Sequence, residues 1–297
     1  MRFEKIFKDD YTVYKNSFSN LTDLHDYLAN KPKVNRRIFK TLASVHESRE
    51  FAGEPLKNAI EYCISGCGDN MNNFLQANEK LNKVKKDISD NRKAVRGLFG
   101  GLPIPSLVAA DIPACMLRYE REASSSVKNI YLNLSYSYIT NTNQIVNRGL
   151  IALFLIQAYE DKGEIVNFNT FELSKLGHEI VDTEINLKRP GERNVDIGKC
   201  YYPLVRKEFL RRILFRVLES TPVENDWAEG YGSPLTAREI RNFLELSDND
   251  IIIPSPDDLE IYGYNIYEDA ENALTNLGLT EDFDIDKIRK LSMYNKR

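Results

Sequence analysis

Residues 133–171 read NLSYSYITNTNQIVNRGLIALFLIQAYEDKGEIVNFNTF, and the fold class is predicted chiefly from this segment. Just before and into it, residues 129–134 have the apolar pattern of a buried strand. Residues 142–162 carry apolar side chains at helical spacing, and Gly163 follows where a helix commonly ends. Residues 164–171 then read as a second strand. The order strand, helix, strand predicts a βαβ unit, in which the two strands are parallel.

The same alternation continues toward the C-terminus. Residues 183–187 and 251–254 read as strands, whereas residues 203–220 and 270–277 read as helices. We therefore expect residues 124–297 to form an α/β domain with a largely parallel sheet flanked by helices.

The N-terminal part has a different pattern, with apolar residues spaced by three and four. We expect residues 1–123 to be a helical region that ends in a connector rich in glycine and proline, and the boundary falls at the small polar run Ala123–Ser126. The predicted helices are residues 22–29, 35–45, 55–65 and 69–98.

Composition limits the classes of function. The chain has 297 residues and a net charge of −4, which argues against a general nucleic-acid binder because such proteins need surplus Lys and Arg. The basic run Lys80–Arg96 contains acidic residues as well and is typical of a solvated helix face. The longest apolar run, Leu150–Ile156, is far shorter than the roughly 20 residues that cross a bilayer, so we expect a buried helix segment.

The start of the chain and its cysteines indicate a cytoplasmic protein. Residues 1–10 lack the apolar segment of a secretory signal. The four cysteines have no zinc-binding spacing, and we expect them to be reduced, buried thiols. For a phage-encoded chain, the compartment would be the host cytoplasm.

The first strand ends in hydroxyl-bearing residues. Ser135 and Ser137 lie two apart after Asn133, where a parallel strand reaches the carboxyl edge of the sheet. Open α/β sheets bind ligands at that edge, and hard divalent cations prefer oxygen ligands. The alternative is structural, because Ser and Asn also cap helices and stabilise turns through local hydrogen bonds.

This strand, the Asn133-x-Ser135-x-Ser137 motif and the following helix and strand resemble the start of a von Willebrand factor A-type domain. The family's motif begins with Asp, and the Asn found here keeps an oxygen but removes the charge that favours Mg²⁺ or Mn²⁺. The family also has a later Thr and Asp, for which Thr183 and Asp196 are the candidates here, and Pro254 follows the strand where an Asp would stand. We expect a degenerate metal site, with no cofactor beyond weak Mg²⁺ binding.

A second resemblance covers other parts of the chain. Phe51-Ala52-Gly53, residues 55–66 and the pair Arg211 and Arg212 before Phe215 are similar to an uncharacterised bacteriophage family. No activity follows from that similarity.

The first functional hypothesis is a phage- or prophage-type protein that binds a protein partner and interferes with a host or defence protein. The von Willebrand resemblance implies that the motif face grips the partner, and the predicted binding residues are Asn133, Ser135, Tyr136, Ser137 and Asp196. Aromatic residues in predicted loops are the expected interface anchors, namely Tyr136, Tyr138, Tyr201, Tyr202, Trp227 and Tyr231.

Two alternative functions stay open. The chain is a metal-dependent hydrolase that acts on phosphate esters, in which Asp196 and Asp250 work with the two serines, or it is a virion component. Whether it forms a homo-oligomer also stays open. No catalytic spacing is recognisable, so we name no catalytic residue and expect a binding protein rather than an enzyme.

Overall fold

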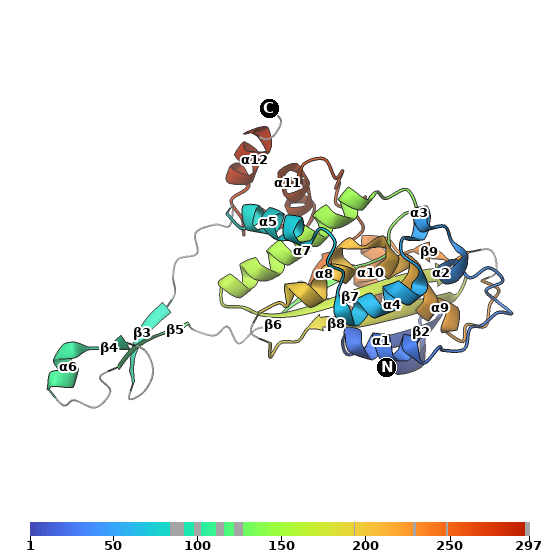
Figure 1. Ribbon diagram of the computed structural model, residues 1–297, viewed down its shortest axis with the longest axis horizontal. Helices are drawn as coiled ribbons and strands as arrows, with labels where there is room; N and C mark the ends of the chain where they lie inside the picture. Colours follow the sequence, from blue (N-terminus) through green and yellow to red (C-terminus); the bar gives the residue numbers. More distant parts are fainter. Residues whose placement is uncertain are drawn as a thin grey trace.

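The computed structural model describes residues 1–83, 92–97, 102–110, 116–121, 127–192, 194–227, 230–247 and 249–294. The predicted α/β class is confirmed, because helices flank a central mixed sheet (Figure 1). The strands of this sheet, in spatial order, are β1 (Arg2–Lys8), β2 (Tyr11–Phe18), β8 (Glu179–Lys188), β7 (Ile165–Leu176), β6 (Val127–Asn133) and β10 (Ile251–Ile253), and the short β9 (Ser233–Pro234) also pairs with β7.

The predicted βαβ unit is present at the centre of the sheet. Strand β6 is parallel to β7, which follows it after a helix, and it is parallel to β10 on its other side. Strand β6 is therefore an interior strand, and its carboxyl end lies at the same edge as the carboxyl end of β10.

The sheet is less parallel than expected. Strands β7 and β8 form an antiparallel hairpin, and so do β1 and β2, while β2 pairs with β8 in parallel. The β7–β8 connection is the two-residue turn Gly177–His178, where Gly177 has a φ of 58°. Glycine adopts this left-handed conformation without steric cost, so the chain reverses directly instead of crossing over through a helix.

Strands β1 and β2 lie within the first 18 residues, in the part of the chain expected to be helical. Of the N-terminal helices, residues 22–29 and 55–65 are predicted nearly correctly as α1 (Leu21–Ala29) and α4 (Leu56–Ser65). Residues 35–42 are not helical, and only α2 (Ala43–His46) forms there. The helix expected to reach residue 98 ends much earlier, as α5 (Met71–Asn82), and residues 84–91 of its predicted span lie outside the described residues.

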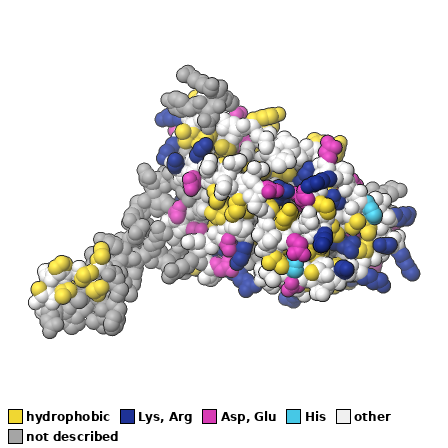
Figure 2. Space-filling model, viewed as in Figure 1, with side chains coloured by type: hydrophobic (Ala, Val, Ile, Leu, Met, Phe, Trp, Pro, Cys, Tyr) yellow, Lys and Arg dark blue, Asp and Glu magenta, His cyan; other side chains and the backbone are white. Residues whose placement is uncertain are grey.

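A second, small sheet follows α5. It has the order β3-β5-β4, formed by β3 (Arg92–Gly97), β5 (Met116–Arg121) and β4 (Leu102–Pro103), and α6 (Pro105–Ala109) accompanies it. Figure 1 shows these elements apart from the central sheet. Figure 2 shows hydrophobic side chains gathered there, among them the exposed Leu102 and Val108.

Helix α7 (Thr142–Asp161) covers the middle of one sheet face. Its run Leu150–Ile156 is entirely buried and packs with Ile130, Leu132 and Phe168, as expected for a buried helix segment. In the described part of the chain, no helix has the length and apolar character needed to span a membrane. The other helices are α3 (Arg49–Ala52), α8 (Ile197–Val205), the π-helical η1 (Phe209–Leu214), α9 (Phe215–Ser220), α10 (Ala237–Phe243), α11 (Ile266–Asn276) and α12 (Ile285–Tyr294).

Local chemistry fixes where α7 begins and how closely it packs. Asn141 and Gln144 form a capping box, in which each side chain accepts a hydrogen bond from the backbone N–H of the other residue. Gly149 faces α8, where a Cβ atom would lie 2.6 Å from the backbone oxygen of Leu204. The missing side chain therefore lets α7 and α8 approach each other closely.

Candidate functional site

The loop after β6 carries the three residues of the predicted motif at the carboxyl end of an interior strand. Asn133 and Ser135 are buried, and the Oδ1 atom of Asn133 accepts a 2.9 Å hydrogen bond from the Ser135 backbone N–H. The Ser137 Oγ atom accepts one from the Ile139 backbone N–H at 3.4 Å. Asn133 and Ser137 thus stabilise the turn through local hydrogen bonds, which was the alternative interpretation of this motif. The helix that follows is capped by Asn141.

Ser135 differs from its neighbours in the loop. Its Oγ atom is buried and has no hydrogen-bond partner. A buried hydroxyl that forms no hydrogen bond costs about 1–3 kcal/mol, so this side chain is not explained by local stability.

A guanidinium group lies directly behind this loop. Arg148, in the second turn of α7, is 1% exposed, and its Nη1 atom donates to the carbonyl oxygens of Asn133 at 2.7 Å and Pro254 at 3.3 Å. Burial lowers the pKa of Arg148 to about 10, which still leaves the group charged at neutral pH. The positively charged side chain of Arg148 therefore connects the carboxyl ends of β6 and β10.

A second guanidinium comes from η1. Arg211 donates through Nη1 to the Phe51 carbonyl oxygen at 2.6 Å and through Nη2 to the Tyr138 carbonyl oxygen at 3.2 Å, and it lies over the Phe51 ring at 4.0 Å. The Tyr136 ring is shared, because the Cζ atoms of Arg148 and Arg211 are each 5.5 Å from its centroid. Burial raises the pKa of Tyr136 to about 12, so the phenol stays neutral between two positive charges.

The charges at this edge do not suit a divalent cation. Within the described part of the chain, neither Arg148 nor Arg211 forms an ion pair with a carboxylate, and no group of three His, Cys, Asp or Glu residues is arranged to hold a metal. A metal at the serine loop would meet one amide, two hydroxyls and a positive guanidinium in contact with the same strand end. The residues present therefore do not fit Mg²⁺ or Mn²⁺.

Titration of the whole chain with Mg²⁺ or Mn²⁺ is expected to show millimolar affinity or none, because the loop lacks a carboxylate and contains Arg148. Isothermal calorimetry measures this directly. Asp196→Ala serves as the matched variant, and we expect it to leave the titration unchanged. Micromolar binding that is lost in Asp196→Ala would contradict this description of the site.

Asp196 is not brought to the loop. It caps α8, where its Oδ1 atom accepts the Lys199 backbone N–H at 3.2 Å. Its neighbour Val195 donates a backbone hydrogen bond to Glu160 at the far end of α7. Twelve residues of helix separate Glu160 from Arg148, which amounts to about 18 Å along the α7 axis.

Asp196 belongs instead to a separate cleft of about 250 Å³. Cys63 and Cys67 also line this cleft, and burial raises their pKa values to about 12 and about 11. Both thiols stay protonated at neutral pH and are poor nucleophiles. Together with the buried Cys200 they confirm the expected buried thiols, while Cys115 lies outside the described residues.

The other candidate ligands are also apart from the loop. Thr183 is buried within β8. Asp250 precedes β10, where its carboxylate accepts from the Asn129 side chain at 2.9 Å and from the Ser247 backbone N–H at 2.9 Å. Asn129 is four residues before Asn133 on β6, or about 13 Å along the strand. The acidic residues of the hydrolase alternative therefore do not converge on the serines.

Exposed aromatic side chains surround the first turn of α7. Tyr138 is 78% exposed and Ile139 is 69% exposed in the loop that enters the helix, and Tyr262 and Tyr264 are 51% and 92% exposed in a neighbouring loop. This second loop packs on the helix, because a Cβ atom on Gly263 would lie 2.8 Å from the Gln144 backbone nitrogen. We call the surface formed by these four exposed residues the α7 entry surface.

Most of the predicted aromatic anchors are not available at the surface. Tyr201, Tyr202 and Trp227 are buried, and Trp227 donates its indole N–H to Glu179 at 2.9 Å. Tyr231 is half-buried and bonded to Glu219 at 2.7 Å. Those predictions are wrong because these aromatics fill the core, and only Tyr138 of the set is strongly exposed.

Most of the chain matches a known protein family. The family described as Domain of unknown function (DUF7192) matches residues 4–281. The chain belongs to the DUF7192 family. The matched region includes most of β1, all of β2, the small sheet and the serine loop, and it ends before α12. No curated protein and no solved structure matches the chain.

Neither arginine of this DUF7192 site was expected to lie there, although Arg211 belongs to the stretch that resembles the bacteriophage family. Arg148 is the only charged residue between Lys128 and Glu160, and it directly precedes a long apolar run. An isolated charge beside such a run indicates a buried side chain that needs polar partners. No local pattern predicts the position of Arg211, because the carbonyl oxygens that it binds, those of Phe51 and Tyr138, are far away in the sequence.

Proposed function

We propose that this DUF7192 chain binds a protein partner through the α7 entry surface, and that the von Willebrand A-like arrangement of β6, the serine loop and α7 presents it. The observation that carries the proposal is the set of exposed Tyr138, Ile139, Tyr262 and Tyr264 side chains on two loops that meet at one helix end. Tyrosines are favoured anchors at protein interfaces because they bury a large ring and keep a polar end.

The surface is held rigidly, which favours binding without a large entropic cost. Arg211 fixes the carbonyl of Tyr138, and the capping box fixes Asn141 and Gln144. Asp269 holds the second loop in place, because its carboxylate accepts hydrogen bonds from the backbone N–H groups of Tyr262 at 2.8 Å and Gly263 at 3.0 Å. Preorganised loops lose less conformational freedom when a partner binds.

The charges beside the aromatics indicate the kind of partner. Asp257, Asp258 and Glu260 are exposed in the same loop as Tyr262 and Tyr264. A complementary partner surface would have pockets for aromatic rings and a rim of Lys and Arg. The bacteriophage resemblance extends this proposal to a host protein as the partner.

The test compares three forms of the full chain in affinity capture from host cells. The Tyr138→Ala/Tyr264→Ala variant is expected to lose at least about tenfold of the binding shown by the wild type, since two interface anchors are removed. Phe7→Ala is the matched control, because Phe7 is 76% exposed on the edge strand β1 and lies outside the α7 entry surface. Thermal unfolding of each variant shows that the fold is retained.

The protein captured by the wild type would then be purified and titrated against the chain at two salt concentrations. We expect affinity to fall as salt rises, because the acidic rim contributes to binding. Equal capture by the wild type and the double tyrosine variant would refute the proposal, and so would the absence of any protein above background.

A further inference from the structure

The face of the sheet opposite α7 is only partly covered. Helix α10 packs over one part of it, where Ile240 contacts a small core that includes Phe171, Leu173 and Ile180. The alternate residues on the neighbouring strands are polar instead. Such residues face away from α7, because successive side chains in a strand point to opposite faces.

A ladder of asparagine side chains crosses this open face. Asn167 donates to Asn129 Oδ1 at 3.0 Å, and Asn186 donates to Asn167 Oδ1 at 2.9 Å and to Asn169 Oδ1 at 2.7 Å. Each of these residues is wholly or partly buried. The ladder fixes the orientation of the amides in it. The amide atom that accepts a hydrogen bond must be the oxygen, so the other atom of that amide is the nitrogen.

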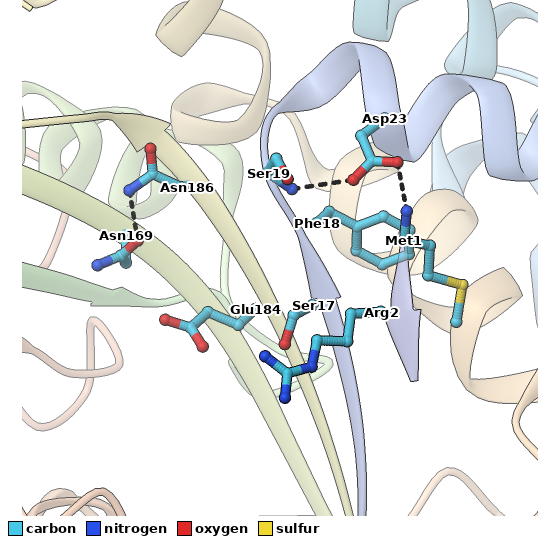
Figure 3. Close-up of a pocket in the computed structure, with 9 residues that line it drawn as sticks. All are labelled: Met1, Arg2, Ser17, Phe18, Ser19, Asp23, Asn169, Glu184 and Asn186. Carbon is cyan, nitrogen blue, oxygen red and sulfur yellow. Dashed lines mark hydrogen bonds and ion pairs between the residues drawn. The ribbon is translucent and has the colours of Figure 1, made fainter. Parts of the chain in front are cut away.

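A cleft of about 410 Å³ lies at the end of this ladder (Figure 3). Asn169 and Asn186 form one side of it, and Glu184, Ser17 and Arg2 lie next to them from three adjacent strands. This volume is within the range of small-molecule sites, roughly 300–1,000 Å³.

Several groups in the cleft have unused hydrogen-bonding capacity. Among the described residues, no partner accepts from Asn169 Nδ2, and none donates to Asn186 Oδ1 or bonds to Ser17 Oγ. Asn169 is only 6% exposed, and the ladder prevents its amide from turning over to satisfy the free nitrogen. The cleft thus offers a fixed donor, a fixed acceptor and a hydroxyl within one small space.

We propose that this cleft binds a neutral polyhydroxylated ligand, the hydroxyl groups of a mono- or disaccharide. Neighbouring sugar hydroxyls each donate and accept, which matches the amide donor of Asn169, the amide acceptor of Asn186 and the carboxylate of Glu184. The charged groups of the cleft are already paired. Glu184 lies 2.9 Å from Lys15 Nζ, Arg2 lies 2.6 Å from Glu4, and Asp23 lies 2.5 Å from the Met1 ammonium group. Because every charged group that lines the cleft has a counter-charge, a neutral ligand fits better than a phosphate or a cation.

The probes are glucose, galactose, mannose, N-acetylglucosamine, maltose and lactose, added at millimolar concentration to the ¹⁵N-labelled full chain. At least one sugar is expected to shift the side-chain amide signals of Asn169 and Asn186 in NMR spectra. Those signals are assigned by their loss in Asn169→Ser and Asn186→Ser. Inorganic phosphate, tested in parallel, is expected to leave them unchanged.

Glu184→Gln and Ser17→Ala are expected to weaken the binding of that sugar by roughly tenfold each, about the loss of one hydrogen bond to a charged or hydroxyl group. Asn58→Ala, an exposed amide on α4, is the control and should not change the affinity. No shift of the two amides with any of the six sugars would overturn the proposal, and so would equal affinity in Glu184→Gln, Ser17→Ala and the wild type. This cleft lies on a different part of the fold from the α7 entry surface, so either proposal can fail without the other.

Discussion

Replacing Arg212 by methionine is expected to lower the free energy of unfolding by about 3–5 kcal/mol, because a buried guanidinium that holds several carbonyls is removed. Arg212 is 3% exposed on η1. It donates to five backbone oxygens at 3.0–3.4 Å, those of Ala43, Ser44, Glu47, Gly53 and Glu54. Methionine has a similar length and no donor, so these carbonyls would lose the hydrogen bonds from the guanidinium, and within the described part of the chain only that of Ala43 would keep a backbone donor, the Glu47 N–H.

Urea denaturation followed by circular dichroism measures this loss. Arg238→Met is the matched control, since Arg238 is exposed on α10, and we expect a change within about 0.5 kcal/mol. Arg212→Lys should also be destabilised, because one ammonium group cannot reach five acceptors spread around a planar fork. If Arg212→Met unfolded at the same urea concentration as the wild type, the guanidinium would not be what joins the segment of residues 43–54 to η1.

Changing Glu172 to glutamine is expected to stabilise the protein at alkaline pH and to have little effect at acid pH. Glu172 is 2% exposed on β7, and its carboxylate accepts a hydrogen bond from Ser174 Oγ. Burial raises its pKa from the ordinary value of 4.5 to about 8. The buried group is therefore protonated in the folded chain over a range in which it is ionised in the unfolded chain.

The sign of the pH dependence follows from that difference. The raised pKa means that the stability contributed by Glu172 is fully present below pH 4.5 and is lost as the pH rises from there through about 8. Each pKa unit corresponds to about 1.4 kcal/mol, so a rise of the pKa from 4.5 to about 8 corresponds to a loss of about 5 kcal/mol. Asp182 acts in the same direction over a narrower window, because burial raises its pKa from 3.8 to about 6.

Denaturation curves of the wild type and Glu172→Gln, collected from pH 4.5 to 9, test this prediction. The wild type should lose stability across the range, whereas the variant should lose much less and exceed the wild type above pH 8. Glu61→Gln, an exposed residue on α4, should follow the wild-type curve. Parallel curves for the wild type and Glu172→Gln would mean that the buried carboxyl group does not titrate in this window.

Strong local periodicity made several elements predictable. The wide apolar stripe of α7 and the stop at Gly163 predicted that helix within one residue of its observed bounds, and α1 and α4 were predicted equally closely. The position of the serine loop was also predictable, since the carboxyl end of a strand before a crossover helix must lie at one edge of the sheet.

The antiparallel pairs were not predictable in the same way. The apolar run of β8 has the same composition whether its partner is parallel or antiparallel, and the choice depends on the two-residue turn at Gly177. The strand β2 likewise gives no sign that it pairs with β8, more than 160 residues later, because that pairing is decided by burial in the assembled sheet.

The α/β class, the central strand–helix–strand unit and the place of the serine loop were predictable from residue order alone, because short-range periodicity acts between neighbours along the chain. Tertiary packing places Arg148 and Arg211 at the edge behind that loop and Asp196 at the far end of α7, and it brings four asparagines together across the open face. These contacts join residues from separate elements, and their partners are chosen by packing and by the need to satisfy buried polar groups, which no local pattern records.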